Sequence, residues 1–219
     1  MFVKFQRKAM SPRSASRVEE IREEKRNLIM DVALEHFSNT GFHATTISQI
    51  AKHAGISKGL MYNYFRSKED LLSAIITRSL AEIYDSFNPD HDSRLTPDEF
   101  ELFIRKVFKL LNEKRQFWKL LFRILLQQGV FESLMGNENL TVVVSGVPLR
   151  DFSQNMTELL VDYFERKKVT AGVDYDPEIE MLMFANAIKG FAMTSIFSPE
   201  LYQGDYLEKV TEAFLKRYK

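Results

Sequence analysis

Hydrophobic residues recur at helical spacing along nearly the whole chain. In residues 18–38 the apolar positions are Ile21, Leu28, Ile29, Val32, Ala33 and Phe37. Gly41 follows as a helix stop signal. Two shorter helical segments, "TTISQIAKHAG" and "SKGLMYNYF", come next and are joined through a Gly-Ile-Ser turn, and another helix is expected over 67–85. These patterns predict an all-α fold.

The second half of the chain shows the same period after a break. The segment 88–98, "NPDHDSRLTPD", is dense in turn-forming residues and is the best candidate for a domain boundary. Helical spacing resumes over 96–111, 115–128 and 152–163. Residues 137–148 lack it, and we expect a loop there, although Thr141 to Val144 has the highest local β-propensity in the chain.

The last two predicted helices, about 177–197 and 205–219, differ from the others. The first is apolar nearly all round, with Asn186 and Lys189 as the main exceptions. A helix that is apolar on every face has to be covered on every face. In a chain this short, the second cover suggests another subunit, so we predict a homodimer formed through these two helices. The alternative is a helix that lies at the centre of a monomeric bundle.

Composition limits the class of protein. The 219 residues are 45% hydrophobic and 27% charged, and they include no cysteine. Disulfides and thiolate metal sites are therefore excluded. No apolar run approaches the roughly 18 residues of a membrane span, and the N-terminus lacks the continuous apolar stretch of a secretory signal. We expect a cytoplasmic protein with no membrane partner.

The net charge is zero, but the charges are unevenly distributed. Residues 1–66 contain 11 Lys and Arg against 6 Asp and Glu, whereas the remainder contains 19 against 24. A basic amino-terminal third suggests contact with a polyanion. Residues 1–17 read as a basic and flexible arm, for which a purely solubilising role is the alternative.

Residues 46–65 fit a helix-turn-helix. Small and apolar residues line one face of the first helix, at Ile47, Ile50, Ala51 and Ala54. Gly55 makes the turn, and Met61 and Phe65 form the inner edge of the second helix. A spacing of 100° per residue puts Gly59, Tyr62 and Asn63 together on the opposite face, beside Lys58. We expect that exposed face to enter a major groove of DNA.

The segment "TTISQIAKHAGISKGLMYNYFRSKEDLLSAII", preceded by "NLIMDVALEHFSNTGFHA", resembles the amino-terminal signature of the tetracycline-repressor (TetR) family of regulators. About 60 residues, 25 to 84, carry the resemblance. It implies an all-α homodimer with a DNA-binding domain and a divergent ligand-binding domain. It also implies a regulator, in most cases a repressor, that binds a palindromic double-stranded DNA operator and is released by a small-molecule inducer.

The resemblance implies a recognition helix from Lys58 to Phe65. Family members contact bases or nearby phosphates from the positions that here hold Lys58, Gly59, Leu60, Tyr62 and Asn63. Positions that commonly bind phosphate hold Thr46, Tyr64 and Lys68. For the two tyrosines, and for Tyr64 above all, packing between helices is the alternative.

An inducer pocket is expected among the helices of residues 96–195. Candidate apolar walls are Phe103, Trp118, Phe122, Met156 and Met183, and candidate polar contacts are Asn155 and Asn186. Aromatic and methionine residues at helical spacing more often belong to a core than to a pocket, so each has that alternative. The many phenylalanines and methionines favour an apolar ligand.

We therefore divide the chain into the arm 1–17, a DNA-binding domain 18–66, and a helical ligand-binding and dimerisation domain 67–219, with helix 67–85 joining the two. No phosphate loop, dinucleotide fingerprint or nucleophile elbow is present, and the four histidines do not stand at metal-ligand spacing. We expect no enzyme, no cofactor and no metal site. The rival interpretation is a helical adaptor that binds protein and has no specific DNA target.

Overall fold

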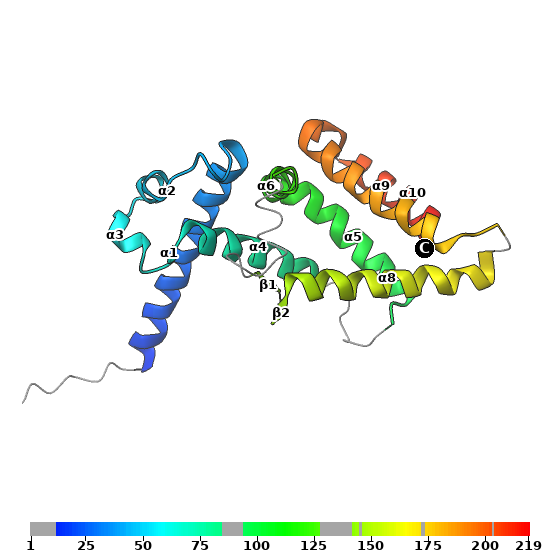
Figure 1. Ribbon diagram of the computed structural model, residues 1–219, viewed down its shortest axis with the longest axis horizontal. Helices are drawn as coiled ribbons and strands as arrows, with labels where there is room; N and C mark the ends of the chain where they lie inside the picture. The colour runs from blue at the N-terminus through cyan, green and yellow to red at the C-terminus, as the bar shows by residue number, and fades with distance from the viewer. Residues whose placement is uncertain (1–11, 85–93, 128–141, 145, 172–173, 203) are drawn as a thin grey trace, which may run out of the picture.

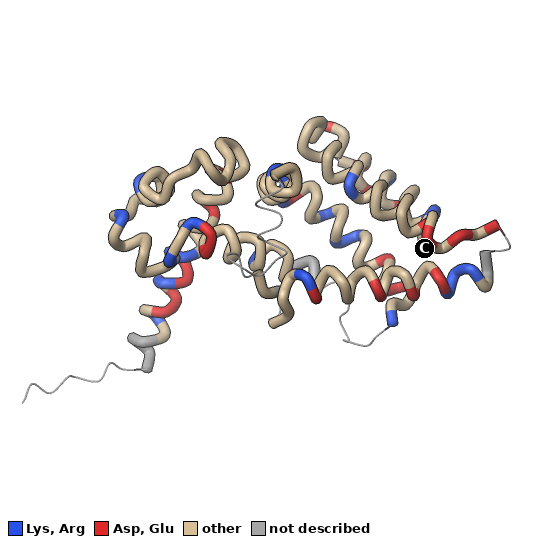
Figure 2. The backbone as a smooth tube through the Cα atoms, viewed as in Figure 1, with Lys and Arg blue, Asp and Glu red and all other residues tan. Residues whose placement is uncertain are grey.

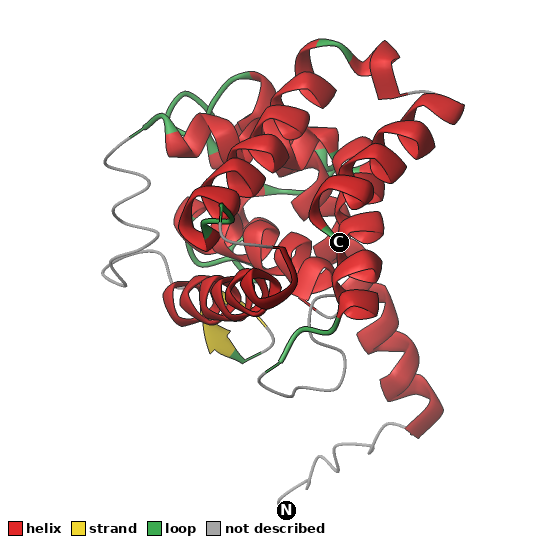
Figure 3. Ribbon diagram, turned by 90° about the vertical axis from the view of Figure 1, so that its right-hand side faces the viewer, coloured by secondary structure: helices red, strands yellow, loops and turns green. Residues whose placement is uncertain are grey.

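The computed structural model describes residues 12–84, 94–127, 142–144, 146–171, 174–202 and 204–219. Helices account for most of them, as predicted (Figure 3). The elements are α1 Pro12–Asn39, α2 Ile47–His53, α3 Lys58–Met61, α4 Lys68–Tyr84, α5 Pro97–Glu113, α6 Arg115–Leu125, β1 Val143–Val144, β2 Val147–Pro148, α8 Leu149–Ala171, α9 Pro177–Phe197, the 3₁₀-helix η1 Pro199–Tyr202 and α10 Asp205–Tyr218. None of the described helices is both long and apolar enough to cross a membrane.

The molecule is elongated, with α2 and α3 at one end and α9 and α10 toward the other (Figure 1). Helices α1 and α4 cross beside the α2–α3 pair, and α4 runs from this crossing toward α5 and α8. Thr46 with Gln49 and Thr96 with Glu99 each form a reciprocal capping box, at the starts of α2 and α5.

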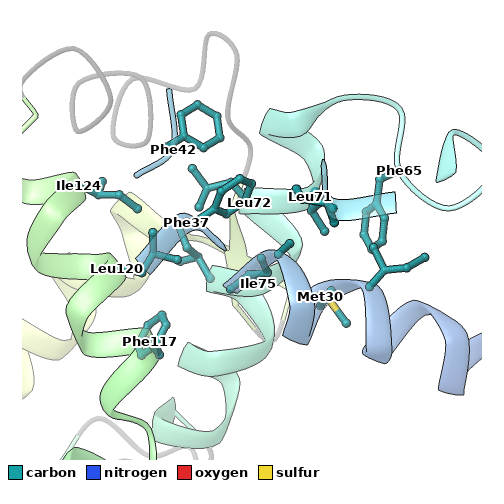
Figure 4. Close-up of a cluster of buried hydrophobic side chains, with 14 of the residues drawn as sticks. Met30, Phe37, Phe42, Phe65, Leu71, Leu72, Ile75, Phe117, Leu120 and Ile124 are labelled. Atoms are coloured by element: carbon teal, nitrogen blue, oxygen red, sulfur yellow. The ribbon is translucent and has the colours of Figure 1, made fainter. Parts of the chain in front are cut away.

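Two hydrophobic clusters hold the chain together. The first unites α1, α2, α3 and α4 with α6, through Phe37, Leu72, Ile75, Phe117 and Leu120 among others (Figure 4). The second joins α5, α8, α9 and α10, and aromatic rings dominate it. Its centre is a stack of Phe100 on Tyr163, whose ring centroids lie 4.4 Å apart. Half-buried Leu80, Trp118 and Met156 contact both clusters and connect them.

Packing connects the two sides of the predicted domain boundary at residue 66, and the division into domains stays a prediction. Helix α6 lies far beyond it in sequence, yet Phe117, Leu120 and Ile124 are buried in the first cluster, and α6 packs along α1. The first helix also begins at Pro12, before the predicted start at residue 18. Of the predicted flexible arm, residues 12–17 are therefore helical, and residues 1–11 lie outside the described part.

The loop predicted at 137–148 needs correction. Val143 and Val144 pair antiparallel with Pro148 and Val147, around Gly146 at φ +86°. The pairing uses the valine-rich run whose β-propensity stood out in the sequence, and Val142 is buried against the first cluster. Residues 128–141 lie outside the described residues, and so do residues 88–93 of the predicted boundary segment 88–98.

Candidate nucleic-acid interface

The turn between α2 and α3 is fixed by the backbone itself. Gly55 has φ +65°, a conformation that side chains with a Cβ disfavour. Its N–H donates to the Lys52 carbonyl at 3.2 Å, and the Ile56 N–H donates to the Ala51 carbonyl at 3.0 Å. These two bonds are the Schellman pattern that closes a helix. The predicted role of Gly55 as the turn residue is confirmed.

Helix α3 is shorter than the predicted span of Lys58 to Phe65. The Ser57 hydroxyl accepts the Leu60 N–H at 3.1 Å, and the regular helix ends at Met61. Residues 62–64 continue as turns, in which the Asn63 and Tyr64 N–H groups donate to carbonyls three residues back. The turn is thus tightened at Asn63 and Tyr64, while the Phe65 N–H donates to the Met61 carbonyl four residues back, at 3.1 Å.

The inner edge of this segment is packed as the sequence predicts. Met61 and Phe65 are buried in the first cluster, and the guanidinium carbon of Arg26 lies 4.7 Å from the Phe65 ring centroid. Tyr64 is half-buried against the same cluster. Packing therefore accounts for part of the Tyr64 side chain, and its predicted phosphate contact stays a prediction.

The five predicted base-side residues share one exposed surface. Lys58, Gly59, Leu60, Tyr62 and Asn63 are all exposed, and Leu60 and Tyr62 retain 40% and 48% of their accessible surface. Exposure of a leucine and a tyrosine beside an amide and an ammonium gives one small surface both apolar and hydrogen-bonding groups. A protein surface that recognises the edges of DNA bases needs both apolar and hydrogen-bonding groups.

Gly59 is not required by the fold. A Cβ placed on it would meet only the Ser57 hydroxyl oxygen, at 4.0 Å, and its backbone lies outside the left-handed region. Glycine in a helix costs about 1 kcal/mol relative to alanine. Among the described residues no contact accounts for that cost, and the predicted approach of DNA to Gly59 stays a prediction.

Thr46 lies at the exposed start of α2. Its hydroxyl accepts the Gln49 N–H at 3.2 Å and lies 2.8 Å from the Gln49 side-chain oxygen. The side chain thereby fixes the first turn of α2, and the predicted phosphate contact would come on top of this role.

Lys68 has a role that the sequence did not reveal. Its ammonium donates to the backbone carbonyls of Phe42, His43 and Thr45, at 2.8, 3.3 and 3.0 Å. It also lies 4.5 Å from the Phe42 ring centroid. An ammonium has three hydrogens, and these three carbonyls account for all of them. The geometry thus favours a structural role, in which Lys68 fixes the α1–α2 connection, over the predicted phosphate contact.

A histidine pair was also missed. His36 on α1 and His53 on α2 place Nε2 and Nδ1 3.1 Å apart, with their rings perpendicular. The contact ties the helix-turn-helix to α1. Local sequence patterns do not predict a contact between two histidines that are 17 residues apart. Within the described segments, no group of three or more acidic, histidine or cysteine side chains is placed to hold a metal ion.

The charge of this region suits a polyanionic partner. Residues 36–68 contain Lys52, Lys58, Arg66 and Lys68 and no acidic residue. In Figure 2 the α2–α3 end carries lysine and arginine segments, whereas acidic segments lie along α1 and at the start of α4. A DNA backbone could approach this end without facing carboxylates.

Four of the seven predicted pocket residues meet in the second cluster, and the other three are exposed. Phe103 is buried in the second cluster, and Trp118, Phe122 and Met156 pack against it while half-buried. The Trp118 indole N–H donates to the Leu110 carbonyl at 3.1 Å. Three others are exposed on α8 and α9, namely Asn155, Met183 and Asn186. For the four residues in the cluster the packing alternative accounts for their burial, and the predicted pocket stays a prediction.

Helix α9 presents a long apolar surface to solvent. Its exposed residues follow a helical period, and we call Ile179, Leu182, Met183, Met193 and Phe197 the α9 face. Leu182 retains 61% and Phe197 74% of its accessible surface. Gly190 lies on the same helix, exposed, and a Cβ there would meet nothing within 4 Å.

Comparison with known sequences identifies the amino-terminal region. Residues 29–75 match the family described as "Bacterial regulatory proteins, tetR family". The chain is 34% identical over 84 residues to the fatty acid metabolism regulator protein of Bacillus subtilis (strain 168) and 38% identical over 74 residues to the transcriptional regulator HbdR of Aromatoleum sp. (strain CIB). These matches span 38% and 34% of this chain, and 43% and 32% of the relatives, so they cover less than half of either protein.

Solved structures extend the likeness to the whole fold. A TetR-like transcriptional regulator from Rhodococcus sp. RHA1 has a TM-score of 0.61 at 21% identity, over 88% of this chain and 94% of that one. The fatty acid degradation regulator FadR from Bacillus halodurans has a TM-score of 0.57 at 18% identity, over 95% of both chains. The family match thus places residues 29–75 in the tetR family of bacterial regulatory proteins, and the solved structures show that the chain as a whole shares the fold of such regulators.

Proposed function

We propose that this protein is a transcriptional regulator that binds a palindromic DNA operator as a homodimer and releases it when a small molecule binds. The exposed surface of Lys58, Gly59, Leu60, Tyr62 and Asn63, on a segment whose inner edge is fully buried, carries the proposal. The family match over residues 29–75 supports the same proposal.

Each of these residues has a chemistry suited to DNA. The Asn63 amide can pair in bidentate fashion with adenine, and the Leu60 side chain can contact a thymine methyl group. Gly59 lets the α3 backbone come close to the duplex. Lys58 adds positive charge at the start of α3, where it can meet a base edge or a phosphate.

The α9 face supports the homodimer. Five large apolar side chains at helical spacing would be covered by the same face of a second copy around a two-fold axis. Gly190 would let the two helices approach closely. The two-fold axis would then present two α3 segments to two half-sites of a palindrome, one helical turn of DNA or a multiple of it apart.

The packing also offers a path from the body to the DNA-binding end. Helix α6 buries Phe117, Leu120 and Ile124 against α1 and α4, and half-buried Trp118 contacts both clusters. A ligand that prefers one position of α6 would thereby also prefer one position of α1 and α3. Only a difference in affinity between the two states can shift their populations.

An apolar inducer is favoured. The second cluster is rich in phenylalanine and tyrosine, and two of the similar proteins carry names that refer to fatty acid metabolism and degradation. We propose a ligand of that apolar character, and we propose repression as the direction of control.

Fluorescence anisotropy with a labelled duplex that covers the DNA upstream of the protein's own gene tests the function. We expect tighter binding to this duplex than to a scrambled one, and a steep loss of affinity between 50 and 200 mM salt because phosphate contacts release counterions. Absence of binding to any duplex, or binding that salt does not change, would instead favour the helical adaptor.

A further inference from the structure

A cleft of about 860 Å³ lies where the DNA-binding end meets the body, and none of the predicted pocket residues lines it. Its walls come from α1 and α4 on one side and from the α5–α6 corner on the other, with Ile196 of α9 at its edge. Clefts between structural units are common ligand sites, and this volume is typical of sites for small molecules.

Positive side chains outnumber negative ones in this cleft. The bases are Arg78, Lys114, Arg115 and Lys119, and the acids are Asp31 and Glu113. Arg78 on α4 forms an ion pair with Asp31 on α1, with 2.6 Å between the guanidinium nitrogen and the carboxylate oxygen. Glu113 forms an ion pair with Lys109 on the same helix, with 3.8 Å between the carboxylate oxygen and the ammonium nitrogen. Both acids of the lining therefore already have a basic partner.

Two of the bases have neutral hydrogen-bond partners. The Arg115 Nε donates to the Asn112 carbonyl at 3.3 Å, and the Lys119 ammonium donates to the Asn39 side-chain oxygen at 2.8 Å. Across the part of the chain that the structure describes, neither makes an ion pair. Both retain N–H groups for an acceptor that enters the cleft.

The same cleft has an apolar part. Leu34, Phe117 and Ile196 contribute to its lining, and Phe117 itself is buried in the first cluster. A ligand that satisfies both parts needs an anionic head for Arg115 and Lys119 and a short apolar body for the hydrocarbon wall. A free inorganic ion has no apolar part and would leave the hydrocarbon wall in contact with water.

We propose that this cleft binds a small organic anion with a carboxylate or phosphate head, held by Arg115 and Lys119. The ligand would bridge α1 and α6, the two helices whose packing joins the DNA-binding end to the body. Its effect on DNA affinity rests on the proposed function, but its binding does not.

Isothermal titration calorimetry on the full chain at low salt, with octanoate, octyl phosphate and octylammonium as probes, tests the site. We expect at least one of the two anions to bind and octylammonium not to bind; which anion binds more tightly distinguishes a carboxylate ligand from a phosphate ligand. The double variant Arg115→Gln/Lys119→Gln should bind the anion at least tenfold more weakly, because it loses two charged donors.

The control is Lys216→Gln, an exposed lysine on α10, which should bind as the wild type does. Melting curves check that each variant is folded. If the double variant does not fold, the single variant Lys119→Gln replaces it in the binding test. Equal binding of octylammonium, no anion binding at millimolar concentration, or unchanged affinity in the folded variants would overturn the site. Anion binding without any effect on the DNA titration would leave the site intact and overturn only its link to the DNA.

Discussion

At the scale of single residues, two glycines lie at exposed helical positions where nothing in the fold requires a glycine. Gly59 on α3 and Gly190 on α9 both have room for a Cβ and ordinary backbone angles. Each reduces helix stability by up to about 1 kcal/mol relative to alanine. Gly59 lies on the proposed DNA surface and Gly190 lies beside the α9 face, so both positions fit the close approach of a partner that we propose.

Gly59→Ala tests this explanation at the DNA surface. The variant should be as stable as the wild type or up to about 1 kcal/mol more stable, because the added methyl meets open space and favours helix. Its affinity for the upstream duplex should fall at least tenfold. Chemical denaturation and anisotropy measure the two effects, with Lys216→Ala as the control; unchanged affinity would show that DNA does not approach Gly59.

Lys68→Met tests the structural role of that lysine. Loss of the three carbonyl contacts, with a side chain of similar length retained, should lower the free energy of unfolding by about 1–3 kcal/mol. Urea denaturation measures the change. Lys52→Met, on the exposed side of α2, is the matched control and should leave stability nearly unchanged. Wild-type stability in Lys68→Met, with uniformly weaker DNA binding, would favour the original phosphate assignment.

At the scale of elements, sequence periodicity predicted what each helix buries but not against which neighbour. Met61 and Phe65 are inside and Tyr62 and Asn63 outside, as 100° spacing requires. The burial of Phe117 and Leu120 against α1 was not predicted, because an amphipathic pattern marks a buried face without naming its partner. The Lys68 carbonyl contacts and the histidine pair join residues 17 to 26 positions apart, which local patterns do not report.

Helix α9 provides an element-scale test of the dimer. Leu182→Glu puts a charge where the single chain leaves 61% of the side chain exposed, so folding should tolerate it. In a dimer the same carboxylate would be buried without a partner, and the dimer should dissociate at least tenfold more readily. Light scattering should fall from about twice 25.6 kDa toward 25.6 kDa.

Val169→Glu is the matched control for this substitution. Val169 is 89% exposed on α8, outside the α9 face, and its replacement should leave the mass unchanged. A wild-type protein that is monomeric at micromolar concentration would contradict the dimer, and a Leu182→Glu protein that stays dimeric would move the interface elsewhere.

At the scale of the whole molecule, the aromatic cluster of the body predicts how the fold responds to alkali. Burial raises the pKa of Tyr163 to about 12 and that of Tyr202 to about 12, since desolvation disfavours phenolate. The unfolded chain ionises tyrosine near pH 10. Because the folded pKa is the higher, this contribution to stability is complete below about pH 10 and is lost as the pH rises toward 12.

Absorbance at 295 nm and circular dichroism at 222 nm, followed together from pH 9 to 12.5, check this response. A late fraction of tyrosine should ionise together with the loss of helix. Early ionisation of all eight tyrosines with the helical signal intact would show that the cluster is open to solvent.

The all-α class and the helix-turn-helix were predictable because both rest on local periodicity, caps and turn glycines. The packing of α5, α6, α8, α9 and α10 against one another was less predictable. The predicted pocket set of aromatic and methionine residues divided between core positions and exposed surface, since composition at helical spacing does not distinguish a cavity wall from a packed interior.

The most direct test of the central claim is the ratio of affinities for the upstream duplex and its scrambled counterpart, measured by anisotropy for wild-type protein and Asn63→Ala. The wild type should prefer its own site. The variant should lose about 1–3 kcal/mol of that preference, as expected for one bidentate base contact, with its affinity for the scrambled duplex unchanged. Equal ratios for the two proteins, or a wild type without preference, would contradict sequence reading by α3.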